Sequence, residues 1–285
     1  MAGELRVERG ESSTAHWETT HGAPGAGLAG LVGSYHGFSE KSLRPVARRE
    51  FGAANVVLIV CFGDPLLVAD ASGRDGGRRL SSFVAGPGEG VTRTEHAGVQ
   101  DGVEVRLSPW GAYQLLGVPT DEIAGRVVGL DEVLGRAGTR LSERLADATD
   151  WRTRFAVLDT VFSRAAATGP RPDRTLVAAW ERLERCHGDL PISDLIADTG
   201  WSRRRLAERF RTQTGLTPKS AARILRFTRA RDLLTRPGHR SLASIALACG
   251  YYDQAHLNRD FQALGQCTPT EYLAAQLADL PGTGH

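Results

Sequence analysis

The most constraining feature of this sequence is a phrase that occurs twice near its C-terminal end. GWSRRRLAERFRTQTGLTP covers residues 200–218, and the variant GYYDQAHLNRDFQALGQCTPTEY covers residues 250–272. In both copies a Gly is followed by an aromatic residue, a Leu and a Phe stand four residues apart, and a Thr-Pro pair closes the unit. A phrase that recurs with the same internal spacing indicates one supersecondary unit used twice.

Each copy is typical of a helix-turn-helix. A short apolar helix, carrying Leu195 in the first copy and Ile245 in the second, precedes the Gly. Gly tolerates the left-handed backbone that ends a helix, and Ser193 and Ser241 are the expected N-caps of these helices. The helix that follows would bury its Leu/Phe pair and leave its polar side chains free. A helix of this kind can enter the major groove of DNA.

Residues 173–277 therefore resemble the DNA-binding domain of the AraC/XylS family of bacterial transcription regulators. In that family two helix-turn-helix units are joined by one long helix, which we expect here over residues 218–235. The resemblance implies two recognition helices, at about 202–213 and 253–264, that enter successive segments of the major groove. The residues that we predict to bind DNA are Arg203, Arg204, Arg205, Glu208, Arg209, Arg211, Gln254, Ala255, His256, Asn258 and Arg259.

These side chains divide into two groups by their chemistry. Arg203, Arg205, Arg209 and Arg211 are expected to anchor phosphates, which positions a protein on DNA without reading sequence. The positions that the resemblance places at base edges are Arg204, Ala207, Glu208, Gln254, Ala255, Asn258 and Arg259. Arg suits guanine, Gln and Asn suit adenine, and Glu accepts from cytosine.

Two residues depart from what a DNA-reading unit ordinarily shows. Glu208 is an acid on a surface that meets phosphate, so it either reads a base or pairs with Arg204 or Arg211; residues a turn apart are in reach, which favours the intrahelical pair. Gln266 stands where the family usually has Gly, as Gly215 stands in the first unit. We therefore expect the second recognition helix to end one residue early or to carry a strained cap.

The charge distribution supports a nucleic-acid partner. The net charge of +2 hides an asymmetry, because residues 171–285 hold 17 Arg and Lys against 12 Asp and Glu, whereas the rest of the chain has an acidic excess. Within residues 201–240 only Glu208 and Asp232 oppose 12 basic side chains. A basic block inside a folded unit is an electrostatic footprint for phosphate. A merely solvated Arg-rich face is the alternative, and the coincidence with the paired motif argues against it.

The first part of the chain alternates short β-rich runs with Gly-rich links. We predict strands at 30–38, 55–62, 65–70, 82–85, 91–96 and 103–107, with 55–62 and 65–70 as neighbours. Short strands separated by turns are typical of a small barrel or sandwich. From Pro109 the pattern becomes helical. The predicted fold class is α+β, with an N-terminal β domain, appended helices, and an all-α C-terminal domain.

This N-terminal part resembles the sensor domain of a subset of the same family, through SFVAG at 82–86, SPWGAY at 108–113 and LLGVP at 115–119. In the family such domains are cupin-type β-barrels followed by helices, and they bind a small effector, dimerise, or both. We predict a flexible tail over 1–20, a sensing or dimerisation domain over 21–168, a linker over 169–173 and the DNA-binding domain over 174–285. A pocket would lie inside the strands around Tyr35, Arg49, Leu58 and Val105.

The helix expected over residues 150–167 has two interpretations. Trp151, Phe155, Leu158 and Phe162 fall at alternating spacings of four and three, which is the seam of a coiled coil. The seam could join two copies of the chain, or it could pack onto the β domain, and both alternatives stay open. Double-stranded DNA is the expected partner, together with a second copy of the chain, a small effector of unknown identity, and RNA polymerase as a candidate.

Other functions have weaker signals. Cys186 beside His187 lacks the flanking residues of a repair nucleophile, and His16, His21, His36 and His96 do not form the HxH pair of a metal cupin. The four Cys are scattered, which fits a reducing cytoplasm and disfavours structural zinc. The first residues lack the apolar core of a signal peptide and no 18-residue apolar run occurs, so we expect neither a signal peptide nor a membrane span. We expect a cytoplasmic protein without catalysis, metal or cofactor; an enzyme or a pure protein-interaction domain fused to the DNA-binding module is the alternative.

Overall fold

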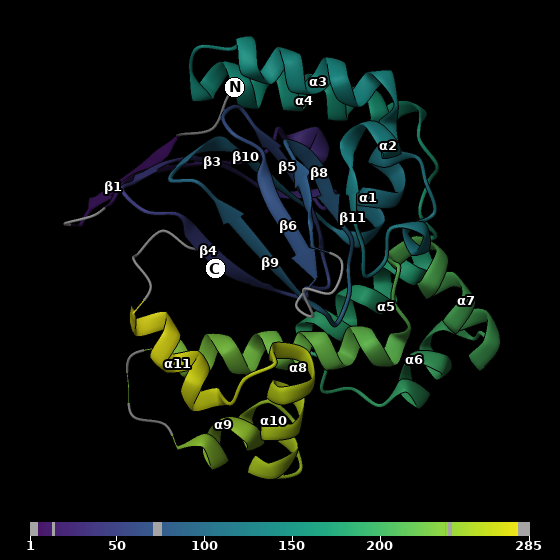
Figure 1. Ribbon diagram of the computed structural model, residues 1–285. Helices are drawn as coiled ribbons and strands as arrows, with labels where there is room; N and C mark the ends of the chain where they lie inside the picture. The colour runs from purple at the N-terminus through teal and green to yellow at the C-terminus, as the bar shows by residue number, and fades with distance from the viewer. Residues whose placement is uncertain (1–4, 13–14, 71–75, 237, 239–240, 279–285) are drawn as a thin grey trace.

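The computed structural model describes residues 5–12, 15–70, 76–236, 238 and 241–278. Figure 1 shows strands packed with helices in the first part of the chain and a helical domain below them. The strands are β1 (Arg6–Glu11), β2 (Ala15–Gly22), β3 (Val32–Ser42), β4 (Val46–Phe51), β5 (Val56–Cys61), β6 (Leu66–Asp70), β7 (Arg78–Leu80), β8 (Ser82–Ala85), β9 (Val91–His96), β10 (Val99–Leu107) and β11 (Val127–Gly129).

These strands form two antiparallel sheets. One has the order β1-β2-β3-β10-β5-β8-β11, and the other has the order β4-β9-β6-β7. The predicted α+β class is confirmed, but no strand pairing between described residues closes the two sheets into a barrel. The expectation that 55–62 and 65–70 are neighbours was wrong, because β5 pairs with β10 and β8 whereas β6 pairs with β9 and β7. The chain changes sheets between them.

Helices cover one face of the larger sheet (Figure 1). They are α1 (Pro109–Leu116), α2 (Leu130–Leu134), α3 (Arg136–Asp147) and α4 (Trp151–Thr168). Side chains alternate across a strand, so Val105 and its register partners Tyr35 and Leu58 all point to this face, where they are fully buried. The opposite face carries Ile59 and Phe83, which pack with residues of the smaller sheet.

The apolar seam of α4 faces this core. Phe155, Leu158 and Phe162 are at most 5% exposed and belong to the same cluster as the sheet residues. Asp150 caps the helix by accepting from the backbone N–H of Thr153. Of the two interpretations of the seam, packing onto the β domain is the one that the structure shows. The seam is therefore not free to join two copies of the chain.

The flexible tail expected over residues 1–20 was a wrong prediction for residues 5–12 and 15–20, and residues 1–4 and 13–14 lie outside the described part. Strands β1 and β2 occupy the described part, and β2 pairs with β3 from Ala15 to Gly22. These strands are polar and lack an apolar period, so the sequence shows no strand signal there. Backbone pairing to β3 and the burial of Ala15 and Thr20 hold β2 in place, and β1 pairs with β2.

The C-terminal domain is helical. Its helices are α5 (Arg174–Arg185), α6 (Ile192–Thr199), α7 (Arg203–Thr214), α8 (Pro218–Thr235), α9 (Leu242–Ala248), α10 (Gln254–Asp260) and α11 (Pro269–Ala278), with the π-helical segment η3 (Phe261–Gly265) after α10. The long joining helix has the predicted bounds. It lies beside both helix-turn-helix units (Figure 1). Each unit has a core of its own, one around Trp180 and Phe210, the other around Phe227 and Phe261.

Helix caps explain where these elements begin. The side chains of Ser202, Thr217, Ser241 and Asp253 each accept a hydrogen bond from a backbone N–H in the first turn of α7, α8, α9 and α10. Ser241 is the predicted cap, whereas Ser193 lies inside α6, whose N-cap is Pro191. Among the described residues, no helix is long and apolar enough to cross a bilayer.

Candidate nucleic-acid interface

Helix α7 presents a continuous basic surface. Its Leu206 and Phe210 are at most 1% exposed, and this burial turns the opposite side of the helix to solvent. The exposed side chains are those that the sequence predicts to bind DNA: Arg203, Arg204, Arg205, Glu208, Arg209 and Arg211. The guanidinium of Arg205 lies 5.1 Å from the ring centroid of Trp201, a cation–π contact that orients this Arg.

Glu208 is exposed on this surface and forms no ion pair with a described Arg or Lys side chain. No described Arg or Lys side chain lies within 4 Å of its carboxylate, so the favoured intrahelical pair with Arg204 or Arg211 is not formed. The physical reason is that a pair at an exposed i, i+4 position gains only a few tenths of a kcal/mol, about 0.2–0.5, which does not outweigh side-chain freedom. Glu208 therefore remains available to accept a hydrogen bond from a base.

Helix α10 is shorter and less charged than α7. Leu257 and Phe261 are fully buried, and Gln254, Ala255 and Arg259 are exposed. The ring of His256 packs edge-on against Tyr251, at a centroid distance of 5.1 Å. Asn258 is half-buried, and its carbonyl oxygen Oδ1 is buried without a hydrogen-bond partner among the described residues. Gln254 and Arg259 are thus the predicted polar side chains that α10 leaves exposed.

The end of the second recognition helix is strained, as the departure at Gln266 predicts. The last turn widens into η3, and Gln266 adopts the left-handed backbone with φ 51°, whereas Gly215 occupies this conformation in the first unit with φ 71°. A non-Gly residue in this region costs about 1–2 kcal/mol. The preceding Gly265 is tightly packed, because a Cβ there would lie 3.2 Å from the Phe227 ring.

A buried acid in α10 was not predicted. Asp260 is 4% exposed, and its Oδ1 accepts from the Arg223 Nε of α8 at 2.8 Å. The same guanidinium, through Nη1, donates to Glu89 of the N-terminal domain at 2.7 Å. Arg223 therefore joins the long helix, the second recognition helix and the first domain. The only signal in the sequence was an acid on the helix face that otherwise buries Leu257.

The N-terminal domain also contacts the first unit. Trp110 of α1 packs edge-on against Trp180 of α5, and it belongs to the core of that unit. The Thr120 hydroxyl donates to the backbone oxygen of Gln213, at the end of α7, at 3.2 Å. At Gly215 an added Cβ would lie 2.8 Å from Pro87 and 3.0 Å from the Thr120 oxygen. The first recognition helix therefore ends directly against the N-terminal domain.

The second unit is held by strand β4. Arg49 Nη2 donates to the backbone oxygens of Gly265 at 2.6 Å and of Gln266 at 3.2 Å. Phe51 packs against Phe227 and Tyr272, and Arg231 stacks over its ring at 4.4 Å. Because β4 reaches the second unit and α1 reaches the first, a change in the N-terminal domain can be transmitted to both.

Three of the four predicted effector contacts are core residues. Tyr35, Leu58 and Val105 are fully buried against the helices, and the Tyr35 hydroxyl donates to Asp159 at 2.8 Å. Burial and this hydrogen bond raise the pKa of Tyr35 well above its usual value. Packing accounts for these three side chains, because a strand turns alternate residues to opposite faces and the sequence does not say which face is packed. Arg49 is exposed and lies on the smaller sheet.

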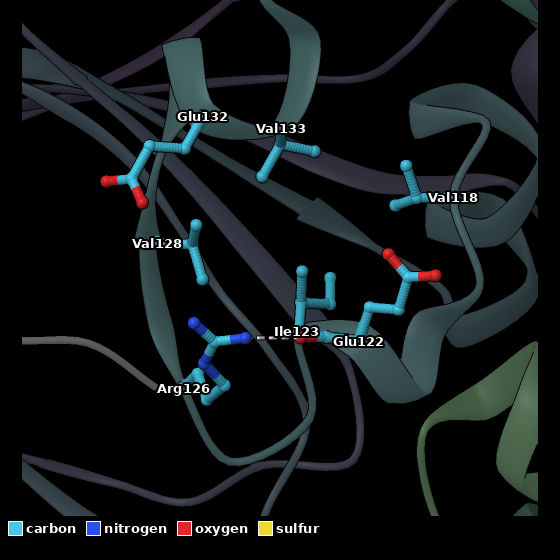
Figure 2. Close-up of a pocket in the computed structure, with 7 residues that line it drawn as sticks. All are labelled: Val118, Glu122, Ile123, Arg126, Val128, Glu132 and Val133. Atoms are coloured by element: carbon cyan, nitrogen blue, oxygen red, sulfur yellow. Dashed lines mark hydrogen bonds between the residues drawn. The ribbon is translucent and has the colours of Figure 1, made fainter.

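One cavity has a volume of about 240 Å³. It is bounded by three elements, namely the segment that follows α1, strand β11 and helix α2. Figure 2 shows Val118, Ile123, Val128 and Val133 among its walls, with carboxylates near two sides. The Arg126 guanidinium donates to the backbone oxygen of Glu122 at 3.0 Å (Figure 2). Glu132 is already bound by Arg78 and by the backbone N–H of Gly129. Few of its polar groups are left for a ligand.

The chain also carries residues of enzyme-like chemistry. The four Cys are unpaired, and burial raises the pKa of Cys61 to about 12 and that of Cys249 to about 11. A thiol with a raised pKa is a poor nucleophile at neutral pH. Within the described part of the chain, no group of three His, Cys, Asp or Glu side chains is placed to hold a metal ion.

Comparisons with known proteins agree on the C-terminal part. The model of a helix-turn-helix domain family matches residues 178–275. The HTH-type transcriptional activator RhaR of Mannheimia succiniciproducens is 41% identical over 63 residues, which make up 22% of this chain and 22% of that protein. The match thus spans about a fifth of the relative's length.

Two solved structures are also similar. A transcriptional regulator of Chromobacterium violaceum, described by its AraC-type DNA-binding domain, is 30% identical and covers 38% of this chain and 95% of its own, with a TM-score of 0.34. The fatty-acid-bound ToxT of Vibrio cholerae is 10% identical and covers 98% of this chain and 100% of its own, with a TM-score of 0.47.

Proposed function

From the match of residues 178–275 to a helix-turn-helix domain family, we propose that the C-terminal part of this chain is an AraC-type DNA-binding domain and that the whole protein is a sequence-specific DNA-binding regulator of transcription. The observation that carries the proposal is the pair of units on one long helix. In each unit the recognition helix buries a Leu/Phe pair and turns polar side chains to solvent. A helix with this arrangement fits the major groove.

In the mechanism that we propose, α7 and α10 enter successive major-groove segments on one face of the duplex. Helix α8 sets the spacing between them, since it packs against elements of both units. Arg203, Arg205, Arg209 and Arg211 hold phosphates, and Arg204, Glu208, Gln254, Asn258 and Arg259 read base edges. The side chain of Asn258 must turn for this purpose, because its Oδ1 is now buried.

The N-terminal domain would act as the regulatory part. Its contacts reach both units, through Trp110 and Thr120 on the first and through Glu89 and Arg49 on the second. A small effector that changed the position of these contacts would change how well the two recognition helices fit DNA together. A second copy of the chain and RNA polymerase are the further partners in this proposal.

The test is selection of duplexes from a random library by the purified full chain. We expect one motif with two conserved segments roughly one helical turn apart, and a binding constant that falls steeply with salt. Enrichment of no motif, with equal affinity for every duplex, would overturn the proposal of sequence-specific regulation. The variant Asp232→Asn is a control that should select the same motif, because Asp232 is an exposed charge of α8 outside the recognition helices.

A further inference from the structure

A second cavity lies where the smaller sheet meets the second helix-turn-helix unit. Its volume is about 510 Å³, and it is lined by Ala47, Arg48 and Arg49 of β4, Arg93 of β9, and Gln266 at the end of the second recognition helix. Cavities of roughly 300–1,000 Å³ are typical of small-molecule sites in proteins. None of the residues that line this cavity is acidic.

Two arginines face each other across this part of the sheet. Arg49 and Arg93 are direct register partners on β4 and β9, and both are exposed. Like charges on directly opposite residues of a sheet repel and destabilise it. No described carboxylate lies within 4 Å of either guanidinium. Glu271, which accepts from Thr268, interacts with Arg49 only at longer range. The repulsion is therefore compensated only in part.

The donors around the cavity are only partly used. Arg48 is bound by Glu40, so it adds little free charge. Arg49 donates hydrogen bonds from Nη2 to the backbone oxygens of Gly265 and Gln266, which are neutral acceptors. A guanidinium has five N–H groups, so Arg49 retains donors, and the exposed amide of Gln266 supplies another. An anion is the class of ligand that this arrangement fits.

We propose that this cavity binds a small anion carrying a phosphate or a carboxylate group, held between Arg49 and Arg93. Oxyanions of this kind accept two parallel hydrogen bonds from a guanidinium, which chloride cannot do. Arg49 also holds the end of the second recognition helix. Binding of the anion to Arg49 therefore shifts the equilibrium between alternative positions of that helix. This last step rests on the proposed DNA-binding function, whereas anion binding itself does not.

The experiment titrates the full chain with inorganic phosphate, pyrophosphate and citrate, each against sodium chloride of equal ionic strength. Calorimetry gives the affinity, and thermal melting gives the stabilisation. Arg93→Gln is the test variant, because it removes half of the anion clamp and leaves the contacts of Arg49 with the second unit. Arg79→Gln is the matched control, since Arg79 is an exposed arginine of β7 in the same sheet.

We expect binding of at least one of these oxyanions, and a roughly tenfold to hundredfold loss of affinity in Arg93→Gln but not in Arg79→Gln. Without anion, Arg93→Gln should melt at the same or a higher temperature, because the repulsion is relieved. Tighter binding of pyrophosphate identifies a phosphate ligand, and tighter binding of citrate a carboxylate. Absence of oxyanion binding above the chloride control, or equal responses in the two variants, would overturn the proposal.

DNA affinity measured with and without the anion separates the two proposals. If the chain binds its selected duplex and no oxyanion binds, the cavity proposal alone fails. If oxyanions bind at Arg93 but no sequence-specific duplex is found, the proposed function fails and the anion site stands. A DNA affinity that the bound anion leaves unchanged would overturn the coupling through Arg49.

Discussion

At the scale of single residues, the two recognition helices carry two kinds of polar side chain. Some are expected to bind DNA phosphates and position the protein, and others to contact bases and read the sequence. Arg259 is exposed on α10, where the neighbouring Asn258 is half-buried, so it is the strongest candidate to read a base in the second unit. Arg209 is also exposed on α7, in a surface rich in arginines, which suits phosphates. The two arginines carry the same charge, so they form a matched pair for mutation.

We predict that Arg259→Ala weakens binding by about 1–3 kcal/mol and relaxes preference at one base position. Arg209→Ala should instead weaken binding to all duplexes alike and reduce the salt slope by about one unit. The measurement is affinity for the selected duplex and its single-base variants at several salt concentrations. Equal weakening across all duplexes in Arg259→Ala would show that this side chain contacts only phosphate.

At the scale of elements, the end of each recognition helix decides how its unit packs. Gly215 and Gln266 adopt the same left-handed conformation, but only Gly does so without steric cost. We predict that Gln266→Gly raises the free energy of unfolding by roughly 0.5–1 kcal/mol. Gly215→Ala should lower it by more than that, because the new Cβ also meets Pro87. Denaturant unfolding of both variants tests this; a destabilised Gln266→Gly would contradict the strain.

The two sheets are joined by a buried charged cluster. Glu40 of β3 accepts from Arg48 of β4 at 2.5 Å and lies 3.5 Å from the His96 ring of β9. Burial raises the pKa of the Glu40 carboxyl, but His96 and Arg48 together outweigh it and hold this pKa below its usual value. A carboxylate of lowered pKa stabilises the fold above its unfolded pKa, and this contribution is lost as the pH falls through its folded pKa.

We therefore predict that Glu40→Gln destabilises the chain by roughly 1–3 kcal/mol at neutral pH. The difference from the unmodified chain should shrink as the pH falls below the ordinary Glu pKa of about 4.3 and then through the lower folded-state pKa, where Glu40 becomes protonated. Denaturant unfolding at a series of pH values measures this difference. A difference that stays constant down to acid pH would show that the ionised carboxylate is not the source of the effect.

At the scale of the whole molecule, the N-terminal domain is packed into the core of the DNA-binding domain. Trp110 is 7% exposed and shares a cluster with Trp180 and Phe210. The polar contacts at Glu89 and Arg49 are partly exposed and add less, since pairs open to solvent contribute little. The aromatic contacts, at Trp110 on the first unit and at Phe51 on the second, are therefore the main links between the domains.

We predict that Trp110→Ala lowers stability by roughly 3–5 kcal/mol and separates the melting of the two domains. Calorimetry should show one transition in the unmodified chain and two in the variant. Glu89→Gln is the comparison, because it removes a polar interdomain contact while Arg223 keeps Asp260. A single transition at a lower temperature in Trp110→Ala would place the coupling at the second unit instead.

The sequence by itself determined the parts whose signals are local. The Leu/Phe spacing, the Ser and Thr caps and the left-handed position at Gln266 each depend on residues within one or two helical turns, so the helix-turn-helix pair and the bounds of α8 were predictable. Strand β5 was predictable for the same reason, because its β-branched run is continuous.

Only the tertiary structure decided which distant residues meet. The polar strand β2 is held by its pairing with β3, and β1 by its pairing with β2, and the change of sheet between β5 and β6 follows from pairings far along the chain. A shift of one residue exchanges the two faces of a strand, so the sequence did not reveal that Tyr35 points to the core and that Arg49 faces Arg93. Likewise, Arg223 and Asp260 are 37 residues apart, and only packing joins them.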